Sequence, residues 1–389
     1  MGISKNSPDM KVLYIAHSEN LQGAGIALIN IVKGMIASGV ECVVTVPFHG
    51  PIEERLTNVG ARCHVVRCYN TIYPPLRGWK DYLFWPYRYL RTLLFNTIAK
   101  KKIETLVMRE QPDVIHTNTG VLRFGAAVAK KYSIPHIWHI REFQNKDFFW
   151  VPIGGEIKLR RLYHETNNHC VAITKAVFNY FNLNTPKDRV IYDGVFSKGI
   201  SIQSAQKEKF FLFVGALLKG KGILDLLDAF NRVSDRIPDH ELWIAGRDYV
   251  DIKGLIVQSP HPDRIQYLGF RDDVYTLMNK AVAVVVPSYY EGFGFITVEA
   301  MLNGTIVIGR DTAGTKEQFD NGLEYCGEEV GIRFTTQREL EEALVSVANN
   351  PDDYQSMILQ ARRLVFEKYT IEENVNELLD YYKSVTHAK

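Results

Sequence analysis

The sequence has no apolar stretch of about 18 residues, which is the length that a membrane-spanning helix requires. We therefore expect no transmembrane helix. Residues 1–10 are polar and lack the apolar segment of a secretory signal peptide, so we expect them to form a disordered leader ahead of the first strand. The five cysteines, without disulfide or metal-site spacing, indicate a cytoplasmic protein.

Several chemical motifs are also missing. The five cysteines are odd in number and have no metal-ligand spacing, so we expect free thiols. No D-x-D carboxylate cluster is present to hold a catalytic metal ion. The first glycine loop contains Gly23 and Gly25, but Leu28 stands where the third glycine of a dinucleotide-binding fingerprint would be. Hydride transfer with a nicotinamide is thus disfavoured, and we expect no cofactor, no metal and no nucleic-acid partner.

Charge is present in balance but is unevenly distributed. Residues 1–200 contain 26 basic and 15 acidic side chains, whereas residues 201–389 contain 20 basic and 29 acidic ones. A basic first half indicates contact with an anionic surface or acceptor. The alternative is that the difference in charge between the two halves arises by chance and from the need for solubility.

The chain is long for one hydrophobic core, because 389 residues correspond to two or three domains of ordinary size. Short apolar strands alternate with amphipathic helical patterns, first from Lys11 and again from Phe210. Residues 197–209 are polar and without apolar period. The pattern predicts an α/β fold with two Rossmann-like domains, a first domain at 11–198, a linker at 199–209 and a second domain that begins at 210.

The most informative stretch is 287–304, PSYYEGFGFITVEAMLNG, which follows the apolar run 281–286. That run is typical of a buried parallel strand, and helical spacing resumes at Phe295. Glycines in such a loop let backbone N–H groups approach a ligand, and the next helix directs its positive end there. Glu291 and Glu299 add two carboxylates, which suit sugar hydroxyls better than phosphates.

A second glycine loop, Lys219-Gly220-Lys221-Gly222, precedes a helix predicted at 223–233. Lysines and glycines at a helix start suit a diphosphate. This loop is therefore a candidate cradle for a nucleotide.

These motifs have a familiar order. The EGFG sequence at 291–294, Glu299 in an EAM sequence, Gly304 and the later Gly-Thr-Lys-Glu at 314–317 resemble the signature of the retaining glycosyltransferases of family 4. The resemblance covers nearly 11–385. It implies the GT-B fold, with two facing Rossmann-like domains and a donor and acceptor cleft between them. A strand-to-helix turn with surface glutamates is the alternative.

The resemblance implies roles in donor binding. Glu299 would hold the ribose, and Glu291 with the backbone of Gly292, Phe293 and Gly294 would hold the transferred sugar. Lys221 would neutralise the leaving diphosphate.

Ala216 occupies the position of a family arginine, so Lys219 and Arg247 are candidates for the missing cation. Phe270 and Arg271 would contact the nucleobase. The loop at Gly23 would approach the donor phosphate or the acceptor, although Gln22 replaces the family's first glycine.

In the first half, many family members have a histidine followed by an acid that contact the transferred sugar. The strand 134–142 ends in His139, Arg141 and Glu142. His139 and Arg141 are the catalytic candidates here, and a buried structural role for His139 is the alternative. The resemblance also implies a nucleotide-sugar domain at 210–369 and a last helix at 370–389 that packs on the first domain.

Residues 69–102 combine aromatic and basic side chains, with two Trp, five Tyr and seven basic residues against one Asp. This composition favours an interfacial helix on anionic lipid. A long pair of core helices with aromatic packing is the alternative. An interfacial helix would indicate a lipid-linked acceptor and membrane association.

The sequence and the resemblance together predict a retaining, metal-independent glycosyltransferase. It would transfer a hexose-type sugar from a nucleotide-sugar to a glycan or lipid-linked acceptor. The similarity of residues 138–142 to enzymes of bacterial surface-polysaccharide assembly favours a UDP-sugar donor. A sugar-nucleotide epimerase of the same architecture, and a nucleotide-sugar-binding protein weakened by Ala216, are the alternatives.

Overall fold

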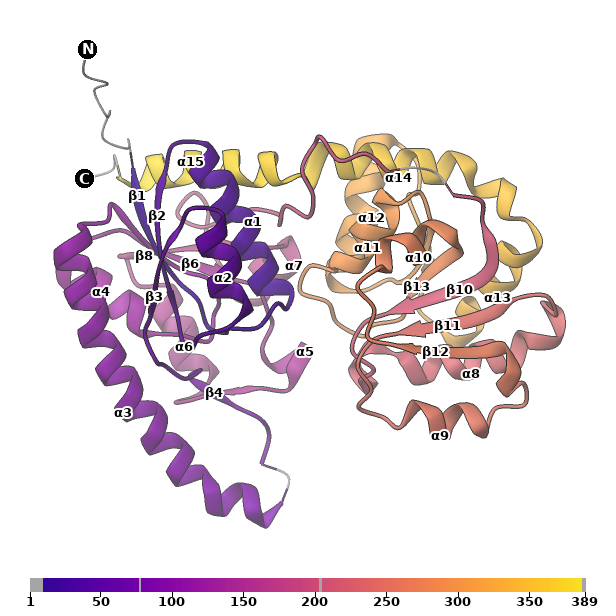
Figure 1. Ribbon diagram of the computed structural model, residues 1–389, viewed down its shortest axis with the longest axis horizontal. Coiled ribbons are helices and arrows are strands. Elements are labelled where there is room, and N and C mark those ends of the chain that lie inside the picture. The colour runs from indigo at the N-terminus through magenta and orange to yellow at the C-terminus, as the bar shows by residue number, and fades with distance from the viewer. Residues whose placement is uncertain (1–9, 77, 203–204, 387–389) are drawn as a thin grey trace. The chain divides into compact units, whose positions relative to one another are not determined.

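The computed structural model describes residues 10–76, 78–202 and 205–386 (Figure 1). The chain forms two compact units: a first unit of Met1–Gly194 with Ile371–Lys389, and a second unit of Val195–Thr370. Apart from Met10, the expected leader lies outside the described residues, as do residues 203–204 of the expected linker and residues 387–389 of the expected last helix. Each unit has its own parallel sheet.

The first unit is built on a seven-stranded parallel sheet of order β3-β2-β1-β5-β6-β8-β9. Its central strands are buried on both faces, so β1 is mostly apolar, while the histidines of β5 and β6 are buried together with their apolar neighbours. The strands are β1 (Lys11–Ile15), β2 (Glu41–Val46), β3 (Arg62–Val65), β5 (Val114–Thr117), β6 (His136–Ile140), β8 (Asn168–Ala172) and β9 (Arg189–Val190). The short strands β4 (Ile72–Tyr73) and β7 (Val151–Pro152) pair antiparallel outside this sheet.

Helices cover the first sheet. They are α1 (Gly23–Ala37), α2 (Pro51–Asn58), α3 (Trp79–Glu110), α4 (Phe124–Tyr132), α5 (Asn145–Phe148), α6 (Glu156–Tyr163), α7 (Lys175–Tyr180) and α15 (Ile371–Thr386). Helix α7 is capped by Thr174, whose Oγ1 accepts a hydrogen bond from Val177 N at 3.2 Å. Residues 143–164, which have no clear apolar period in the sequence, contain the short elements α5, β7 and α6.

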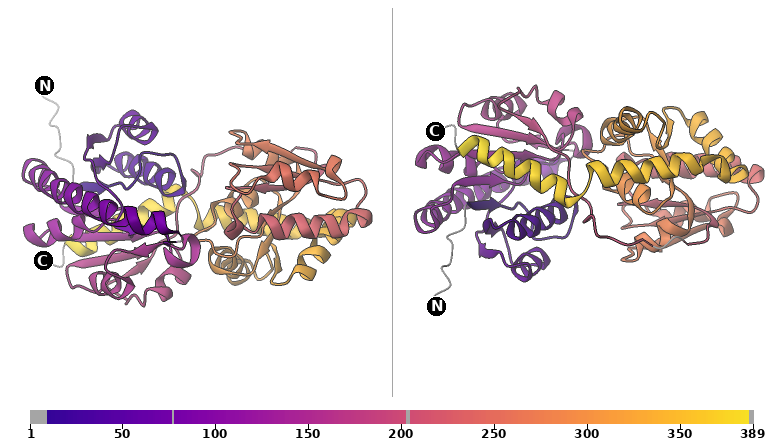
Figure 2. Two further views of the ribbon diagram at one scale, coloured as in Figure 1. Left: turned by 90° about the horizontal axis from the view of Figure 1, so that it is seen from below. Right: turned by 90° about the horizontal axis from the view of Figure 1, so that it is seen from above.

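Helix α15 packs into the core of the first unit although it comes 176 residues after the rest of that unit. Its apolar residues, among them Val375 and Leu378, are buried with those of β1 and α1. A Cβ on Gly34 of α1 would lie 2.4 Å from Val375 Cγ2, so a glycine is needed for the two helices to approach. Figure 2 shows α15, in yellow, running across the first unit.

Helix α3 is one continuous helix of 32 residues, so the alternative of a pair of core helices is wrong. It passes through Pro86 without ending and buries its second part, including Ile103 and Val107. Its first part extends from the body of the first unit (Figure 1). Within the described parts of the chain, no helix is both long and apolar enough to cross a membrane.

The second unit is built on a six-stranded parallel sheet of order β12-β11-β10-β13-β14-β15. The strands are β10 (Glu208–Val214), β11 (Glu241–Ala245), β12 (Ile265–Gly269), β13 (Ala281–Val286), β14 (Ile306–Arg310) and β15 (Ile332–Phe334). Strand β13 is fully buried and has the predicted bounds. Strand β10 begins at Glu208, inside the segment that we expected to be linker, because Glu208 already pairs with Ala281 of β13.

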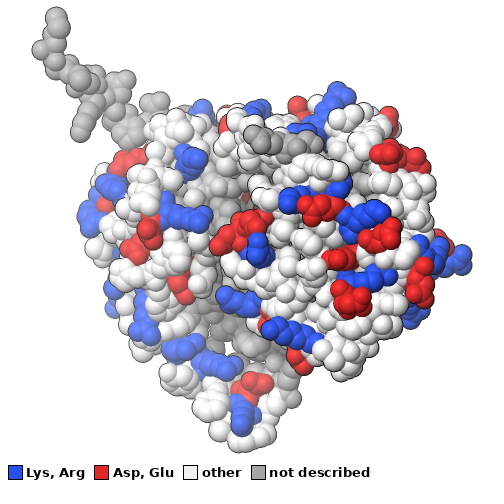
Figure 3. Space-filling model, turned by 45° about the vertical axis from the view of Figure 1, so that its right-hand side comes forward, with Lys and Arg blue, Asp and Glu red and all other residues white. Residues whose placement is uncertain are grey.

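The helices of the second unit are α8 (Ile223–Val233), α9 (Ile252–Val257), α10 (Val274–Lys280), α11 (Phe295–Leu302), α12 (Ala313–Cys326), α13 (Gln337–Asn349) and α14 (Gln355–Lys368). Short 3-10 turns lie at Lys219–Lys221, Ser234–Arg236, Pro262–Arg264 and Pro351–Tyr354. Helix α8 has the predicted bounds, since its apolar stripe meets the sheet in one core. The surface of this unit mixes acidic and basic side chains closely (Figure 3).

Candidate functional site

The candidate donor site lies where the strand order of the second sheet reverses. Strand β10 has β11 on one side and β13 on the other, so the chain leaves β10 in one direction and returns on its other side. In open α/β sheets, ligands bind outside the carboxyl ends of strands at such a point. The loops that follow β10 and β13 contain both glycine motifs singled out in the sequence.

These two loops are in direct contact. Gly222 has a φ of 70°, and a Cβ there would lie 2.1 Å from Pro287 O. The backbone N–H of Tyr289 donates to Gly220 O at 3.0 Å. Glycine at 222 is thus required both by the left-handed conformation and by the close approach of the two loops.

The two loops bring together the side chains predicted to contact the diphosphate and the sugar. Lys221 Nζ lies 2.6 Å from Glu291 Oε1. The two side chains are 27% and 19% exposed, so both are shielded and still accessible. Lys219 is exposed on the same turn and makes no ion pair within the described part of the chain.

The EGFG loop is held by α12, which sequence analysis had noted only as a motif. Gly314 N donates to Glu291 O at 3.0 Å, and a Cβ on Gly314 would lie 2.3 Å from Phe293 O. Gln318 Nε2 also donates to Phe293 O at 2.7 Å. The Phe293 ring is buried against Tyr369, so its side chain is structural and only its backbone can face a ligand.

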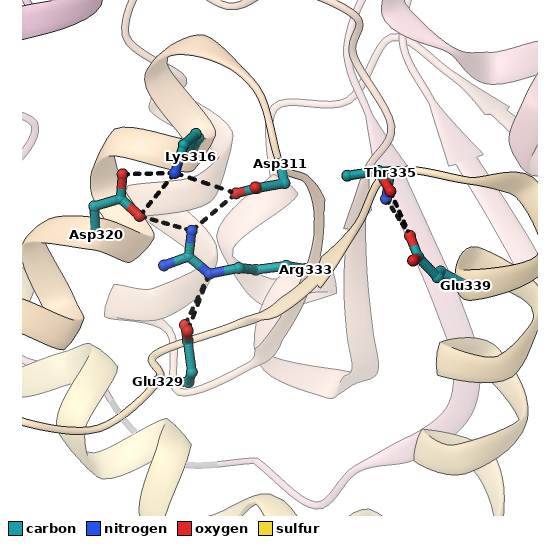
Figure 4. Close-up of polar contacts among 7 residues, drawn as sticks. All are labelled: Asp311, Lys316, Asp320, Glu329, Arg333, Thr335 and Glu339. Atoms are coloured by element: carbon teal, nitrogen blue, oxygen red, sulfur yellow. Dashed lines mark hydrogen bonds and ion pairs between the residues drawn. The ribbon is translucent and has the colours of Figure 1, made fainter.

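Helix α12 is in turn fixed by a network of charged side chains around Arg333 of β15 (Figure 4). Arg333 Nη1 contacts Asp311 and Asp320, each at 2.8 Å, and its Nε contacts Glu329 at 3.0 Å. Lys316 Nζ adds an ion pair of 2.9 Å to Asp320. Several coupled charges can stabilise a helix position better than an isolated surface pair. This network was not predicted, because its members come from four separate segments.

Glu299 lies in α11, the helix that follows the EGFG loop. The residue before this helix, Gly294, has a left-handed backbone conformation. Its Oε1 accepts a hydrogen bond of 3.4 Å from the Tyr275 hydroxyl of α10. Burial raises the pKa of Glu299 to about 7. Burial and the neighbouring Glu299 charge raise the pKa of Tyr275, which therefore stays a donor. Sequence analysis missed Tyr275, since no local motif marks it.

A second set of contacts supports the loop after β13. Arg310 Nε donates to Pro287 O at 2.9 Å, and its guanidinium lies 4.3 Å from the centre of the Tyr289 ring. The hydroxyl of Tyr289 donates to Asp225 at 2.7 Å, and Arg310 pairs with the same carboxylate. Arg310 is thus occupied by structural partners.

The other donor-binding residues predicted in the second unit lie in the loops that follow the neighbouring strands β11 and β12. Leu217 N donates to Arg247 O at 2.9 Å, which places the backbone of Arg247 beside Ala216. The Arg247 side chain is exposed. Phe270, directly after β12, is 74% exposed. Arg271 forms a surface ion pair of 2.6 Å with Asp273, the residue before α10, whose carboxylate makes no capping hydrogen bond to the helix.

In the first unit, Gly23 is exposed as the first residue of α1, whereas the end of β6 is buried. Arg141 Nη1 lies 2.5 and 2.6 Å from the two oxygens of Asp193. Its Nε donates to Asn118 at 3.1 Å. Arg141 is 6% exposed and Asp193 1%. This pair joins the end of β6 to the last residues of the first unit's main segment, so Arg141 has a structural role whatever it does in catalysis.

His139 belongs to a buried chain of hydrogen-bonding groups. Its Nδ1 lies 3.2 Å from Arg141 Nη2 and from His116 Nε2. Because a guanidinium can only donate, His139 Nδ1 accepts and its Nε2 carries the proton. His116 Nε2 then donates, and its Nδ1 accepts from the Tyr382 hydroxyl at 2.5 Å. Burial and the Arg141 charge lower the pKa of both histidines, so they stay neutral.

His139 Nε2 has no hydrogen-bond partner among the described residues, although it is buried. The burial fits the structural alternative for His139, and a role toward the transferred sugar stays a prediction. Glu142, three residues further along the chain, is also buried and accepts a hydrogen bond from Gly120 N at 3.0 Å. Burial and the Asp147 charge raise the pKa of Glu142 to about 8. Sequence analysis gave Glu142 no separate role.

Each unit has a parallel sheet, and in the second sheet two glycine loops meet where the strand order reverses. This arrangement defines a two-domain α/β protein of the GT-B type. The family model of the Glycosyl transferases group 1 matches residues 200–364, and that of the Glycosyl transferase 4-like domain matches residues 22–177. An uncharacterised glycosyltransferase of Methanocaldococcus jannaschii is 30% identical over 288 residues, which are 72% of this chain and 74% of that protein. The chain therefore belongs to the glycosyl transferases group 1, which confirms the predicted family.

Other similar proteins include an O-antigen chain mannosyltransferase and a glycosyltransferase involved in lipopolysaccharide biosynthesis. The O-antigen chain mannosyltransferase RfbU of Salmonella typhimurium is 29% identical over 185 residues, 46% of this chain and 50% of that protein. The structure of Anabaena HepE in complex with UDP has a TM-score of 0.76 at 20% identity, covering 96% of this chain and all of that one. WaaG, involved in lipopolysaccharide biosynthesis, has a TM-score of 0.66 at 13% identity, covering 95% and 99%. These two structures confirm the predicted fold.

Proposed function

We propose that this glycosyltransferase transfers a hexose-type sugar from a UDP-sugar to a glycan or lipid-linked acceptor with retention of anomeric configuration and without a metal ion. The observation that carries the proposal is the 2.6 Å contact between Lys221 and Glu291 at the strand-order reversal of the second sheet. It brings a cation for a diphosphate next to a carboxylate for sugar hydroxyls. UDP-bound HepE, which shares the fold, supports the choice of donor.

Each residue of the donor site has a role that follows from its chemistry. Glu299 accepts hydrogen bonds from the ribose, and Glu291 with the backbone of residues 292–294 orients the sugar. The bond between the anomeric carbon and the phosphate oxygen breaks, and a bond to the acceptor oxygen forms. The acceptor proton passes to the leaving phosphate. Lys221 stabilises the charge that develops on that phosphate, and such preorganised cations are large contributors to catalysis.

The family arginine is replaced by Ala216, and Arg247 is the cation that we propose in its place. Its backbone lies beside the Ala216 loop and its side chain is exposed. His139, Arg141 and Gly23 would serve the transferred sugar and the phosphates from the first unit. Phe270 would stack on the nucleobase, because its ring is largely exposed next to a strand end.

Helix α3 provides the proposed contact with a membrane surface. Its first part exposes a series of large apolar side chains: Trp79, Tyr82, Leu83, Phe84, Tyr87, Leu90, Leu93 and Leu94. Basic and acidic side chains both lie among white ones at the lowest part of the view in Figure 3. Exposed apolar and basic residues on one helix suit the interface of an anionic bilayer. A lipid-linked acceptor would be presented there.

The experiment that tests the proposal is nucleotide release from UDP-, GDP- and ADP-sugars, with EDTA, in the presence and absence of a lipid-linked acceptor fraction. Release from one donor that rises with acceptor supports a transferase. An NMR spectrum of the product with inverted anomeric configuration would contradict retention. Tight nucleotide binding without release, in the wild type and in Arg247→Gln alike, would instead establish a binding protein.

A further inference from the structure

A pocket of about 340 Å³ lies between the first part of α3 and the segment around β4. One face of the helix forms one wall with Trp85, Arg88, Tyr89 and Thr92, which follow helical spacing. The opposite wall consists of Tyr69, Asn70, Ile72, Tyr73, Pro74 and Ile153. This face differs from the outward apolar residues of α3, so the pocket is separate from the surface proposed to meet a membrane.

The pocket contains a set of aromatic rings in fixed orientations. The rings of Trp85 and Tyr89 are stacked, with centroids 5.2 Å apart and planes inclined by 10°. Tyr73 meets Trp85 edge-on at 6.1 Å. Tyr69 is fixed by two hydrogen bonds between its backbone and the Asn96 side chain, of 2.9 and 2.8 Å. Rigid aromatic faces with polar edges suit the C–H faces and hydroxyls of a saccharide ring.

The pocket also contains cations and unused hydrogen-bonding groups. The Arg91 guanidinium lies 4.1 Å from the centre of the Tyr69 ring, and its buried Nε has no partner among the described residues. The buried Oδ1 of Asn70 likewise has no partner in that part of the chain. Arg88 approaches Asp81 only at 4.0 Å. Since an unpaired buried donor or acceptor is costly, a ligand with both kinds of group would satisfy this site.

The charged side chains around the pocket indicate that its ligand is anionic. Arg88 and Arg91 line the pocket, and Arg67 donates to the Tyr69 hydroxyl from outside it. Among the described residues, Asp81 is the acidic side chain that pairs with one of these arginines, at 4.0 Å from Arg88. Arginine is the side chain best suited to bidentate contacts with phosphate. From the rings, the two unpaired polar atoms and this excess of cations, we propose that the pocket binds the phosphate-bearing saccharide of the acceptor.

That the ligand is the acceptor of the reaction rests on the proposed function, whereas the chemistry of the ligand does not. A sugar phosphate at the end of a lipid and a free sugar phosphate present the same groups to the pocket. The position on α3 favours a lipid-linked form, because the same helix carries the exposed apolar face. The acceptor specificity of the enzyme would then depend on the residues of this pocket.

The test uses the full chain, with α-glucose 1-phosphate and N-acetylglucosamine 1-phosphate as probes in calorimetry. Inorganic pyrophosphate is the comparison for charge alone, and vesicles of phosphatidylglycerol are the comparison for a lipid surface. Arg91→Gln removes the pocket cation. Lys101→Gln is the matched control, since Lys101 is an exposed lysine of the same helix outside the pocket. Arg88→Gln, at an exposed position, guards against a folding defect of Arg91→Gln.

We expect Arg91→Gln and Arg88→Gln to weaken binding of at least one sugar phosphate about tenfold or more, while Lys101→Gln leaves it unchanged. Equal binding in all variants, or equal affinity for pyrophosphate, would overturn the inference. So would sugar-phosphate binding lost only in Glu299→Ala, which belongs to the donor site. Vesicle binding that falls equally in Arg91→Gln and Lys101→Gln, without any sugar-phosphate effect, would show a lipid surface alone and also overturn it.

Nucleotide binding, measured on the same samples, separates this inference from the proposed function. Loss of sugar-phosphate binding in the pocket variants with intact nucleotide binding supports the inference. Absence of nucleotide binding in the wild type would defeat the proposed function, whereas binding of sugar phosphate that depends on Arg91 would still support the pocket as a sugar-phosphate site.

Discussion

Lys221 and Glu291, 70 residues apart in sequence, form an ion pair of 2.6 Å between the loops that follow β10 and β13. The pair joins the residue that we assign to the donor diphosphate to the residue that we assign to the sugar. A change at either position therefore affects the orientation of the other. Measurements on both partners are needed to separate charge from position.

The first prediction concerns Glu291. We expect Glu291→Ala to lower the turnover of sugar transfer by about 100-fold or more, because an interaction with the reacting sugar is lost. Nucleotide binding, measured by calorimetry with UDP, should stay mostly intact. Glu291→Gln keeps the shape of the side chain and shows how much of the effect depends on charge. Transfer at the wild-type rate in Glu291→Ala would disprove the assignment.

Glu299 should behave in the opposite way. Glu299→Ala removes the acceptor of the ribose hydroxyls, so we expect nucleotide affinity itself to fall about tenfold or more. The same calorimetric titration measures it, with Glu291→Ala as the comparison. If the two variants bind the nucleotide equally well, the division of roles between the two carboxylates is wrong.

Nucleotide binding should depend on pH through Glu299. Its pKa is raised to about 7 by burial, so at pH 6 most of the free protein has a neutral carboxyl at this position. The carboxylate is the better acceptor, and affinity for UDP-glucose should therefore rise as the pH increases from 6 to 8, by up to about tenfold per unit below the pKa. Glu299→Gln should abolish this dependence. An unchanged pH profile in that variant would point to another titrating group.

Glu142 should affect stability rather than binding. Its pKa in the folded chain is raised to about 8, above the unfolded value of about 4.3, so the folded state retains a proton that the unfolded state releases. The free energy of unfolding should then fall between pH 5 and pH 8, by up to about 1.4 kcal/mol per unit from this group. Glu142→Gln keeps the acceptor for Gly120 N and should flatten the fall and raise Tm at pH 8. Parallel pH profiles of Tm in the two proteins would contradict this.

The contact between the two glycine loops can be tested at Gly222. Gly222→Ala places a methyl group against Pro287 O and strains a left-handed backbone, so we expect a loss of about 1–3 kcal/mol in stability and a loss of nucleotide binding. Gly220→Ala is the matched control, because a Cβ at 220 has no atom within 4 Å. Equal effects of the two substitutions on denaturant unfolding would mean that the close approach is unimportant.

Local chemistry made much of the donor site predictable. The buried strand β13, the EGFG loop and α11 follow one another directly, and α8 has the expected bounds because its apolar stripe has helical spacing. The partners that fix these elements were not predictable. Tyr275 reaches Glu299 from 24 residues away, and Arg141 reaches Asp193 across 52 residues. Such contacts depend on how elements pack, which residue spacing does not encode.

The aromatic and basic segment shows a different limit. Its composition allowed an interfacial helix or a pair of core helices, since both need apolar side chains at helical spacing. The structure decides for a single helix that passes through Pro86 and buries only its second part. The sequence could not show this, because exposure depends on what else covers the helix.

The place of α15 also determines the order in which the chain can fold during synthesis. The core around β1 includes Val375 and Leu378, and Tyr382 completes the hydrogen bond to His116. As residues leave the ribosome in order, the second unit, Val195–Thr370, is fully synthesised before α15 exists. The first unit, although it begins earlier, must wait with an uncovered apolar face until its last helix emerges. The unit whose synthesis begins first is therefore the unit whose core can be completed only at the end of synthesis.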